Sequence, residues 1–305
     1  MGTVIEIEKL SKRYRNVLAV DDLSLELKKG EIYGFIGLNG SGKTTTIRMM
    51  LGMIKPTQGT CRLFGEKVTL SHYSLWKKVG SLVETPHSYP ELTVKENLDL
   101  FRRLRLLKDV NAVDRIIEKL KLTAYANRKA KHLSLGNAQR LGIAKALLHG
   151  PDILILDEPV NGLDPAGIVE VRELLQDLAG NEGVSIFLSS HLLSEVSLIA
   201  DKIGIIHHGQ LVNEFQTGQL ESLLERKLLV NTRHNEAAAS ALADQGISCL
   251  TNQEGQIEIA ERHLLERPER VSESLVRNGF PPIHISVEKE SLESYFLKSI
   301  RREGR

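Results

Sequence analysis

The chain has 305 residues, of which 41% are hydrophobic and 26% charged, and this predicts about two globular domains with cores of their own. A formal net charge of +1 excludes an overall basic field for nucleic acid, and no apolar run approaches the roughly 18 residues of a membrane-spanning helix. Cys61 and Cys249 stand far apart in dissimilar contexts, which is typical of a reduced cytosolic protein. Because residues 1–10 also lack a signal-peptide core, we expect a soluble protein that meets membranes only through a partner.

The first elements are two strands with an aromatic residue between them. Residues 4–7 and 23–27 alternate between apolar and polar side chains, as strands do. Tyr14 lies between them in a polar stretch, and two interpretations stay open. Its ring stacks on a nucleotide base, or it packs on the edge of a sheet.

A phosphate loop follows, with the pattern G-x-x-x-x-G-K-[ST] over residues 37–44, between an apolar strand (32–36) and a helix that runs to Leu51. The glycines let backbone N–H groups approach phosphates closely, and the helix N-terminus adds partial positive charge. Lys43 is placed to reach the terminal phosphates and Thr44 to bind Mg²⁺. The motif predicts that the chain binds a nucleoside triphosphate. The residues assigned to this binding are Gly37, Asn39, Gly40, Ser41, Gly42, Lys43, Thr44 and Thr45.

The middle of the chain is predicted to be mainly helical. Short strands are expected at 60–64 and 79–83, and then Thr93, with Glu96 three residues later, has the pattern of a capping box. Apolar residues recur at helical spacing over 97–122 among many basic ones, so the segment is either a solvated face or a surface for an acidic partner or lipid headgroups. Ser134 suits the N-cap of the next helix, which is expected to end at Leu148.

Candidate catalytic groups follow two later strands. The apolar run 153–156 predicts a strand buried on both faces, and Asp157 and Glu158 follow it at the sheet edge where α/β proteins bind ligands. Asp157 is expected to hold Mg²⁺, and Glu158 to orient or deprotonate water. His191 follows the strand 184–188 and is expected at the same edge, where it would contact the terminal phosphate.

Beyond about residue 220 the chain loses its glycine-rich loops and acidic clusters. Strand and helix patterns in the order β–α–β–β–α–β predict a small α+β module, in which we find no chemistry. The predicted domains are therefore residues 1–220, with a helical subdomain over about 85–150, and residues 221–305.

Taken in order, these motifs resemble the nucleotide-binding subunits of ABC transporters over residues 1 to about 220. The resemblance implies an α/β P-loop NTPase fold, in which a mixed sheet core carries a helical subdomain. It implies ATP and Mg²⁺ as cofactors and ATP hydrolysis as the activity. It also implies a head-to-tail dimer, in which Ser134 and Gly136 close on the γ-phosphate held by the other subunit's phosphate loop. Residues 161–164 match the family's D-loop, and Asp164 would link the two sites; Tyr14 matches its adenine-stacking aromatic residue.

Two positions depart from the family pattern. The usual L-S-G-G-Q signature reads Leu133-Ser134-Leu135-Gly136-Asn137, so Leu135 adds bulk near the dimer interface. The usual Gln of the Q-loop is Glu84, which can still coordinate Mg²⁺ or water but adds negative charge near the γ-phosphate. Both departures resemble the subgroup that exports, or confers immunity to, bacitracin and lantibiotics.

The subgroup implies a homodimer, or a pair with another ABC ATPase, that works on separate membrane permeases without nucleic acid. It implies a cytoplasmic protein, peripheral on the inner face of the cell membrane. Closure on ATP would move the permease, which Glu84 and residues 93–107 would touch, and hydrolysis would reopen the dimer. The alternatives are an importer subunit, a soluble ABC ATPase of translation or DNA repair, and a nucleotide switch without hydrolysis.

Overall fold

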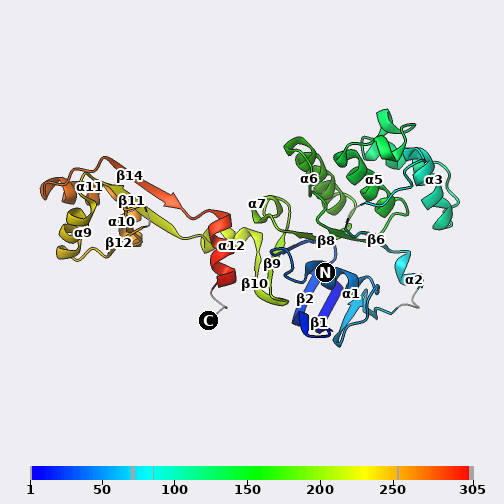
Figure 1. Cartoon of the computed structure of the whole chain (residues 1–305), viewed down its shortest axis with the longest axis horizontal. Coiled ribbons are helices and arrows are strands. Elements are labelled where there is room, and N and C mark those ends of the chain that lie inside the picture. The colour runs from blue at the N-terminus through cyan, green and yellow to red at the C-terminus, as the bar shows by residue number, and fades with distance from the viewer. Residues whose placement is uncertain (1, 70–72, 85, 253, 302–305) are drawn as a thin grey trace. The chain divides into compact units, whose positions relative to one another are not determined.

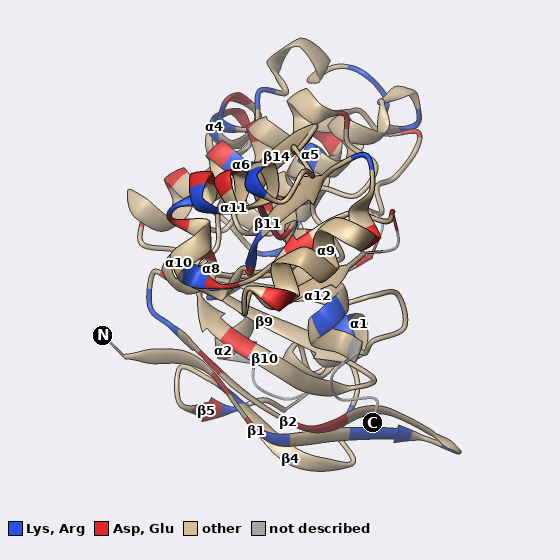
Figure 2. Cartoon of the chain, turned by 90° about the vertical axis from the view of Figure 1, so that its left-hand side faces the viewer, with Lys and Arg blue, Asp and Glu red and all other residues tan. Residues whose placement is uncertain are grey.

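The computed structural model describes residues 2–69, 73–84, 86–252 and 254–301 of the chain. The described residues form two compact units. The second is Gln219–Lys298, and the first consists of the described residues up to Gly218 together with residues 299–301. Residue 85, where we predicted the helical subdomain to begin, lies outside the described residues. Lys and Arg residues are interspersed with Asp and Glu along the helices and strands (Figure 2), in keeping with the net charge of +1.

The first unit begins with an antiparallel sheet in the order β2-β1-β4-β5. Strand β1 is longer than the sequence predicts, because the polar stretch around Tyr14 continues the strand up to a tight turn. Apolar side chains that alternate along β1 and β2 pack into the largest core of the unit. The strands are β1 (Thr3–Tyr14), β2 (Val17–Lys28), β4 (Gln58–Leu63) and β5 (Glu66–Lys67).

The second sheet of this unit has the order β10-β9-β3-β8-β7-β6 and is parallel except for the edge strand β10. Every residue of β3, β7 and β8 is buried, because α5 and α6 cover one face of the sheet, and α1 and the antiparallel sheet cover the other (Figure 1). This confirms the mixed-sheet core. The strands are β3 (Ile32–Ile36), β6 (Val79–Leu82), β7 (Ile153–Asp157), β8 (Ser185–Ser190), β9 (Lys202–His207) and β10 (Gln210–Gln216).

Two helices of the first unit, α3 and α5, start where the caps Thr93 and Ser134 predict. The Thr93 side chain accepts the Glu96 N–H, and the Glu96 carboxylate accepts the Thr93 N–H, so the capping box is confirmed. The helices are α1 (Lys43–Met50), α2 (Tyr73–Trp76), α3 (Val94–Leu104), α4 (Ala112–Lys119), α5 (Leu135–Leu147), α6 (Pro165–Gly180) and α7 (Leu193–Val196), with 3₁₀ turns at Thr123–Tyr125, Ala130–His132 and Thr217–Gln219.

The helical stretch expected over 97–122 was wrong in one respect, because a turn divides it into α3 and α4. Leu106 adopts a left-handed backbone with φ +56°, which ends α3. The Arg102 guanidinium reaches forward to the carbonyl of Leu107, 2.7 Å away, and holds this turn. None of the described helices is long and apolar enough to cross a membrane.

The second unit is an antiparallel sheet in the order β12-β13-β11-β14, packed on helices. Leu228, Val230, Ile257 and Ile259 project from the sheet into a core with side chains from α9 and α11, so the β–α–β–β–α–β order is confirmed. The predicted order includes strand β12, but the sequence analysis did not say which residues form it. The elements are α8 (Leu220–Leu223), β11 (Arg226–Asn231), α9 (Asn235–Asp244), β12 (Cys249–Thr251), β13 (Ile257–Ile259), α10 (Arg262–Leu265), α11 (Pro268–Arg277), β14 (His284–Lys289) and α12 (Leu292–Arg301).

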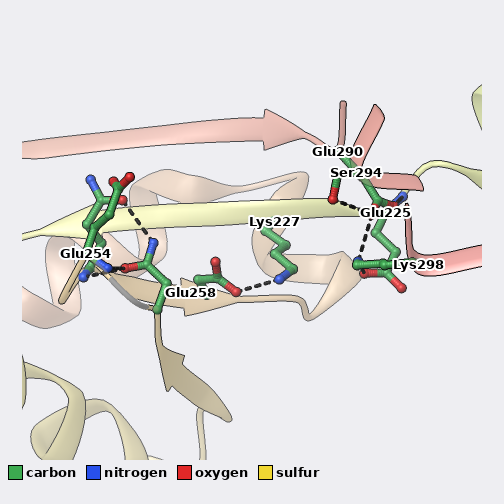
Figure 3. A network of polar contacts seen from close by, with 9 residues as sticks. Glu225, Lys227, Glu254, Glu258, Glu290, Ser294 and Lys298 are labelled. Carbon is green, nitrogen blue, oxygen red and sulfur yellow. Dashed lines mark hydrogen bonds and ion pairs between the residues drawn. The ribbon is translucent and has the colours of Figure 1, made fainter. Parts of the chain in front are cut away.

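A network of polar contacts ties the start of β11 to α12 within this unit (Figure 3). Lys298 Nζ lies 2.7 Å from Glu225 Oε2 and 2.8 Å from Glu290 Oε1. The Glu290 carboxyl is 6% exposed and also accepts the Ser294 hydroxyl at 3.1 Å. Lys298 thus neutralises a buried carboxylate that would otherwise be costly to fold.

Candidate nucleotide-binding site

The phosphate loop joins the end of β3 to the start of α1, and its glycines are required by the space around them. A Cβ on Gly37 would stand 2.4 Å from Ser41 Oγ and 2.6 Å from the carbonyl oxygen of Ile206. Gly42 has φ +111°, and a Cβ there would stand 2.5 Å from the carbonyl oxygen of Ala19. Other residues at either position would push the loop away from its neighbours, so the tight curve depends on glycine.

Lys43 places its charge at the mouth of this loop. It is 5% exposed, and Nζ donates to the carbonyls of Gly37 at 2.7 Å and Leu38 at 3.2 Å. Ser41 Oγ is buried and has no hydrogen-bond partner in the described part of the chain. A buried hydroxyl without a partner is costly, and a phosphate oxygen in the loop would supply one. The donors in this loop therefore fit a phosphate group.

A hydroxyl and a carboxylate meet beside the loop. Thr44 Oγ1 donates to Asp157 Oδ2 at 2.8 Å, and Asp157 is 2% exposed at the end of β7. The described residues contain no group of three or more His, Cys, Asp or Glu side chains placed to hold a metal. One hydroxyl and one carboxylate fit Mg²⁺, which takes few protein ligands and fills its shell with phosphate oxygens and water.

Glu158 stands at the centre of the remaining contacts. Its backbone is left-handed with φ +50°, a strained conformation for a non-glycine residue. Oε2 accepts from His191 Nδ1 at 2.9 Å, while Oε1 lies 3.3 Å from Lys43 Nζ, is buried and accepts no hydrogen bond. This oxygen is available to accept a proton or to orient water.

The structure also identifies a residue that sequence reasoning missed. Ser189 Oγ donates to Asp157 Oδ1 at 2.5 Å and accepts the Glu158 N–H at 3.0 Å. In the sequence Ser189 directly follows the strand expected over 184–188, and that place at the end of a buried strand was a usable signal. Ser189 completes one connected cluster with Lys43, Thr44, Asp157, Glu158 and His191.

Other predicted site residues lie outside this cluster. Tyr14 is 43% exposed at the end of β1, with Lys12 Nζ 5.0 Å from its ring centre, so it does not pack into a sheet edge. Glu84 has φ +60° and forms an ion pair with Arg48 of α1. Asn39 is exposed in the loop, and Thr45 is half-buried in the first turn of α1.

Ser134 and Asp164 both begin helices. Ser134 Oγ accepts the Asn137 N–H at 3.3 Å at the start of α5, and Gly136 follows in the first turn. Asp164 Oδ1 accepts the Gly167 N–H at 3.1 Å at the start of α6. Within the described residues, no hydrogen bond or ion pair joins Tyr14, Glu84, Ser134 or Asp164 to the cluster around Glu158.

The segment after Glu84 is held by a buried lysine of α5. Lys145 Nζ donates to the carbonyl of His87 at 2.8 Å and to Ser88 Oγ at 2.7 Å, and it lies 4.7 Å from the ring centre of Phe101. Burial lowers the pKa of Lys145 to about 8. The side-chain amide of Asn97 on α3 holds Tyr89: its Oδ1 accepts the Tyr89 N–H, and its Nδ2 donates to the Tyr89 carbonyl. Residues 87–89 are thus anchored to two helices.

Three features define a P-loop NTPase here. They are a phosphate loop whose tight curve depends on glycine, the hydrogen-bonded pair Thr44 and Asp157, and the Glu158 carboxylate close to Lys43 of the loop. Residues 20–161 match the family described as "ABC transporter". The chain is 40% identical over 303 residues to the bacitracin transport ATP-binding protein BcrA of Bacillus licheniformis, covering 98% of each. It is 35% identical over 233 residues to the lantibiotic transport ATP-binding protein SrtF of Streptococcus pyogenes, covering 75% of this chain and 100% of that protein.

A solved dimeric bacterial ABC transporter cassette superposes with a TM-score of 0.64 at 26% identity, covering 70% of this chain and 98% of the cassette. The chain belongs to the ATP-binding subunits of ABC transporters, and it is an ATP hydrolase. The family and the fold predicted from the sequence are both confirmed.

Proposed function

We propose that this chain powers the export of an antimicrobial peptide of the bacitracin or lantibiotic type through separate membrane permease subunits. Support comes from the likeness to a bacitracin transport protein, which extends over 98% of both chains and so includes the second unit. The observation that carries the ATPase part is the cluster in which Glu158 Oε1 lies buried and without a hydrogen bond, 3.3 Å from Lys43 Nζ.

The residues of the cluster take separate roles in this proposal. Lys43 and Ser41 bind phosphate oxygens, while Thr44 and Asp157 hold Mg²⁺, which neutralises phosphate charge when bound. Glu158 accepts a proton from, or orients, the attacking water through Oε1. His191 holds Glu158 by its other oxygen and contacts the γ-phosphate. Glu84 would add a further oxygen ligand after leaving Arg48.

The residues outside the cluster act in contacts with other subunits. Ser134 and Gly136 sit at the start of α5, and we propose that they bind the γ-phosphate held by a second subunit, with Asp164 joining the two sites. The likeness to a dimeric cassette supports a homodimer or a pair with another ABC ATPase. Tyr14, exposed at a strand end, would stack on the adenine.

The anchored segment after Glu84, with α3, is the proposed contact for the permease. Lys145 and Asn97 hold residues 87–89 rigidly, so a force on this surface would reach α5 and Ser134. We place the protein in the cytoplasm, on the inner face of the cell membrane, where that contact would hold it.

The test is Glu158→Gln in the purified full-length chain. ATP binding should stay within about twofold of wild type, while Mg²⁺-dependent phosphate release should fall by a factor of about 100 or more, because the proton acceptor is gone. The control is Glu8→Gln. Glu8 lies on β1 and forms an ion pair with Arg62 of β4, so this variant should hydrolyse ATP normally. Turnover near wild type in Glu158→Gln would contradict the role of Glu158. Failure of the complex with its permease to raise bacitracin or lantibiotic tolerance in cells would contradict the cargo.

A further inference from the structure

The start of α5 and the turn before α6 interlock through two leucines and two glycines. Leu135 Cδ2 lies 2.4 Å from the point where a Cβ of Gly162 would stand. Leu163 Cδ2 lies 3.4 Å from the point where a Cβ of Gly136 would stand. Leu135 therefore occupies space that a side chain at Gly162 would need, whereas Leu163 lies at ordinary van der Waals distance from Gly136. Gly162 also has φ +74°, a conformation that suits glycine, so its lack of a side chain serves both the turn and the contact.

Burial alone does not account for Leu135. Leu135 is 53% exposed, so only part of its apolar surface leaves water, and its Cδ2 packs closely on Gly162. We therefore look for the role of this leucine in the close fit to Gly162 as well as in burial. This gives the bulky residue of the Leu133–Asn137 segment a specific partner in its own chain.

A second contact keeps the two helices in register. Arg140, one turn further along α5, forms an ion pair with Glu170 of α6, and Lys121 Nζ lies 3.7 Å from the same carboxylate. The apolar contact lies in the turn before α6 and the ionic contact lies within α6, so α5 is joined to this part of the chain at two separate points.

Both interlocked segments carry groups of the proposed mechanism. Ser134 caps α5 directly before Leu135. The turn that holds Gly162 begins at Glu158, whose carbonyl accepts the Asn161 N–H at 3.1 Å, and it ends at Asp164, the cap of α6. A shift of this turn would therefore move the backbone of Glu158.

We propose that Leu135 and Leu163 are positioning residues for hydrolysis. By fitting on Gly162 and Gly136 they make the Ser134 helix start and the Glu158–Asp164 turn move as one body within a subunit. ATP that engages Ser134 of one subunit then sets the catalytic carboxylate of that same subunit. This inference rests on the proposed roles of Ser134 and Glu158.

The first test is Leu135→Ala in the full-length protein. We expect kcat for ATP to fall about tenfold, because small misplacements of catalytic groups are costly, while KM stays within about twofold. The melting temperature should change by less than about 3 °C, since the side chain is half exposed. Leu135→Met, which keeps the reach of the side chain, should recover kcat to within about twofold.

Leu198→Ala is the matched control, because Leu198 is 55% exposed, is also an aliphatic side chain, and lies outside the interlock. Its kcat should equal that of wild type. A normal or raised kcat in Leu135→Ala would overturn the proposal, as would a fall that Leu135→Met does not recover.

The second test is a double-mutant cycle. Gly162→Ala places a methyl group against Leu135 and also strains the turn at φ +74°, so it should lower kcat alone. Leu135→Ala opens the space for that methyl and leaves only the strain of the turn. The double variant should therefore be no slower than the slower single variant, and rates that multiply would overturn the interlock. If Ser134→Ala and Glu158→Gln both hydrolyse ATP normally, the proposed function fails instead. If those two are inactive and Leu135→Ala is normal, the interlock alone fails.

Discussion

Ser189 Oγ donates a 2.5 Å hydrogen bond to Asp157 Oδ1 and accepts the backbone N–H of Glu158 at 3.0 Å. Ser189 is fully buried, so no water competes for either contact. One hydroxyl on β8 therefore orients Asp157, the last residue of β7, and Glu158, which directly follows it. It leaves Asp157 Oδ2 free for Thr44 and holds the strained backbone from which Glu158 projects.

Replacing Ser189 with alanine should impair the Mg²⁺-dependent step. The change leaves the Glu158 N–H buried without a partner and frees Asp157 to rotate, a cost of about 1–3 kcal/mol. We expect kcat to fall by about 10- to 100-fold and the Mg²⁺ concentration for half-maximal rate to rise, measured by phosphate release across a Mg²⁺ titration.

The control is Ser185→Ala at the opposite end of the same strand. Ser185 is buried to the same degree and its Oγ accepts the Gly30 N–H at 2.9 Å, so it loses a comparable hydrogen bond far from the carboxylates. It should lose stability without a change in the Mg²⁺ requirement. A matching Mg²⁺ shift in both variants would mean that Ser189 acts only through stability.

His191→Ala should slow hydrolysis and spare binding. The Nδ1–H of His191 fixes Glu158 Oε2 at 2.9 Å, and its loss lets the carboxylate turn toward Lys43. We expect kcat to drop by about 10- to 100-fold with KM for ATP within about threefold, measured by steady-state kinetics. A selective rise in KM would instead make His191 a binding residue.

Local signals predicted much of this molecule. The phosphate loop and the capping box at Thr93 are fixed by residues a few positions apart, so the sequence contains them whole. The break between α3 and α4 was missed because apolar spacing continues across it, while the left-handed backbone of Leu106 has no composition signal.

Contacts between strands and segments could not be predicted in this way. Ser189 meets Asp157 only because the register of β7 and β8 sets them side by side. Leu135 stood out in the sequence as bulk near an interface, but its partner Gly162 follows from how α5 and α6 pack. Both contacts join residues that are distant in the chain, so no local spacing of residues in the sequence predicts them.

His149 should make the first unit sensitive to mild acid. Burial, with the positive charge of Arg105, lowers the pKa of His149 to about 4, although its Nε2–H donates to the Val79 carbonyl at 3.1 Å. Between about pH 6.5 and 4 the unfolded chain therefore binds a proton that the folded chain does not, and stability falls as pH falls through this window.

His149→Gln removes that titration and retains a donor for Val79. The melting temperature of wild type should drop more steeply than that of the variant between pH 7 and pH 5, measured by differential scanning fluorimetry. His263→Gln, at an exposed site on α10, is the control and should follow wild type. Parallel curves for His149→Gln and wild type would show that His149 is not the group responsible.

Lys298→Met should loosen the second unit in a pH-dependent way. Burial raises the pKa of Glu290, but hydrogen bonds from Lys298, the Glu225 backbone and Ser294 outweigh it, so the pKa lies below its ordinary value. A carboxyl with a lowered pKa stabilises the fold above its unfolded pKa, about 4.3, and this stability is lost as pH falls further.

The variant keeps the aliphatic length of the side chain but leaves the Glu290 carboxylate without its cation. Because Lys298 is 39% exposed, we discount the cost of a fully buried pair to about 1–2 kcal/mol at pH 7. The backbone N–H of Glu290 donates to the Glu225 carbonyl, and its hydrogen exchange should become faster because of this loss of stability. Arg277→Met, which breaks an exposed ion pair with Glu273, should change the exchange rate little.

The difference in the free energy of unfolding between Lys298→Met and wild type should become smaller below pH 4, where Glu290 takes up a proton in both proteins. A gap that stayed constant with pH would assign the effect to packing and not to charge.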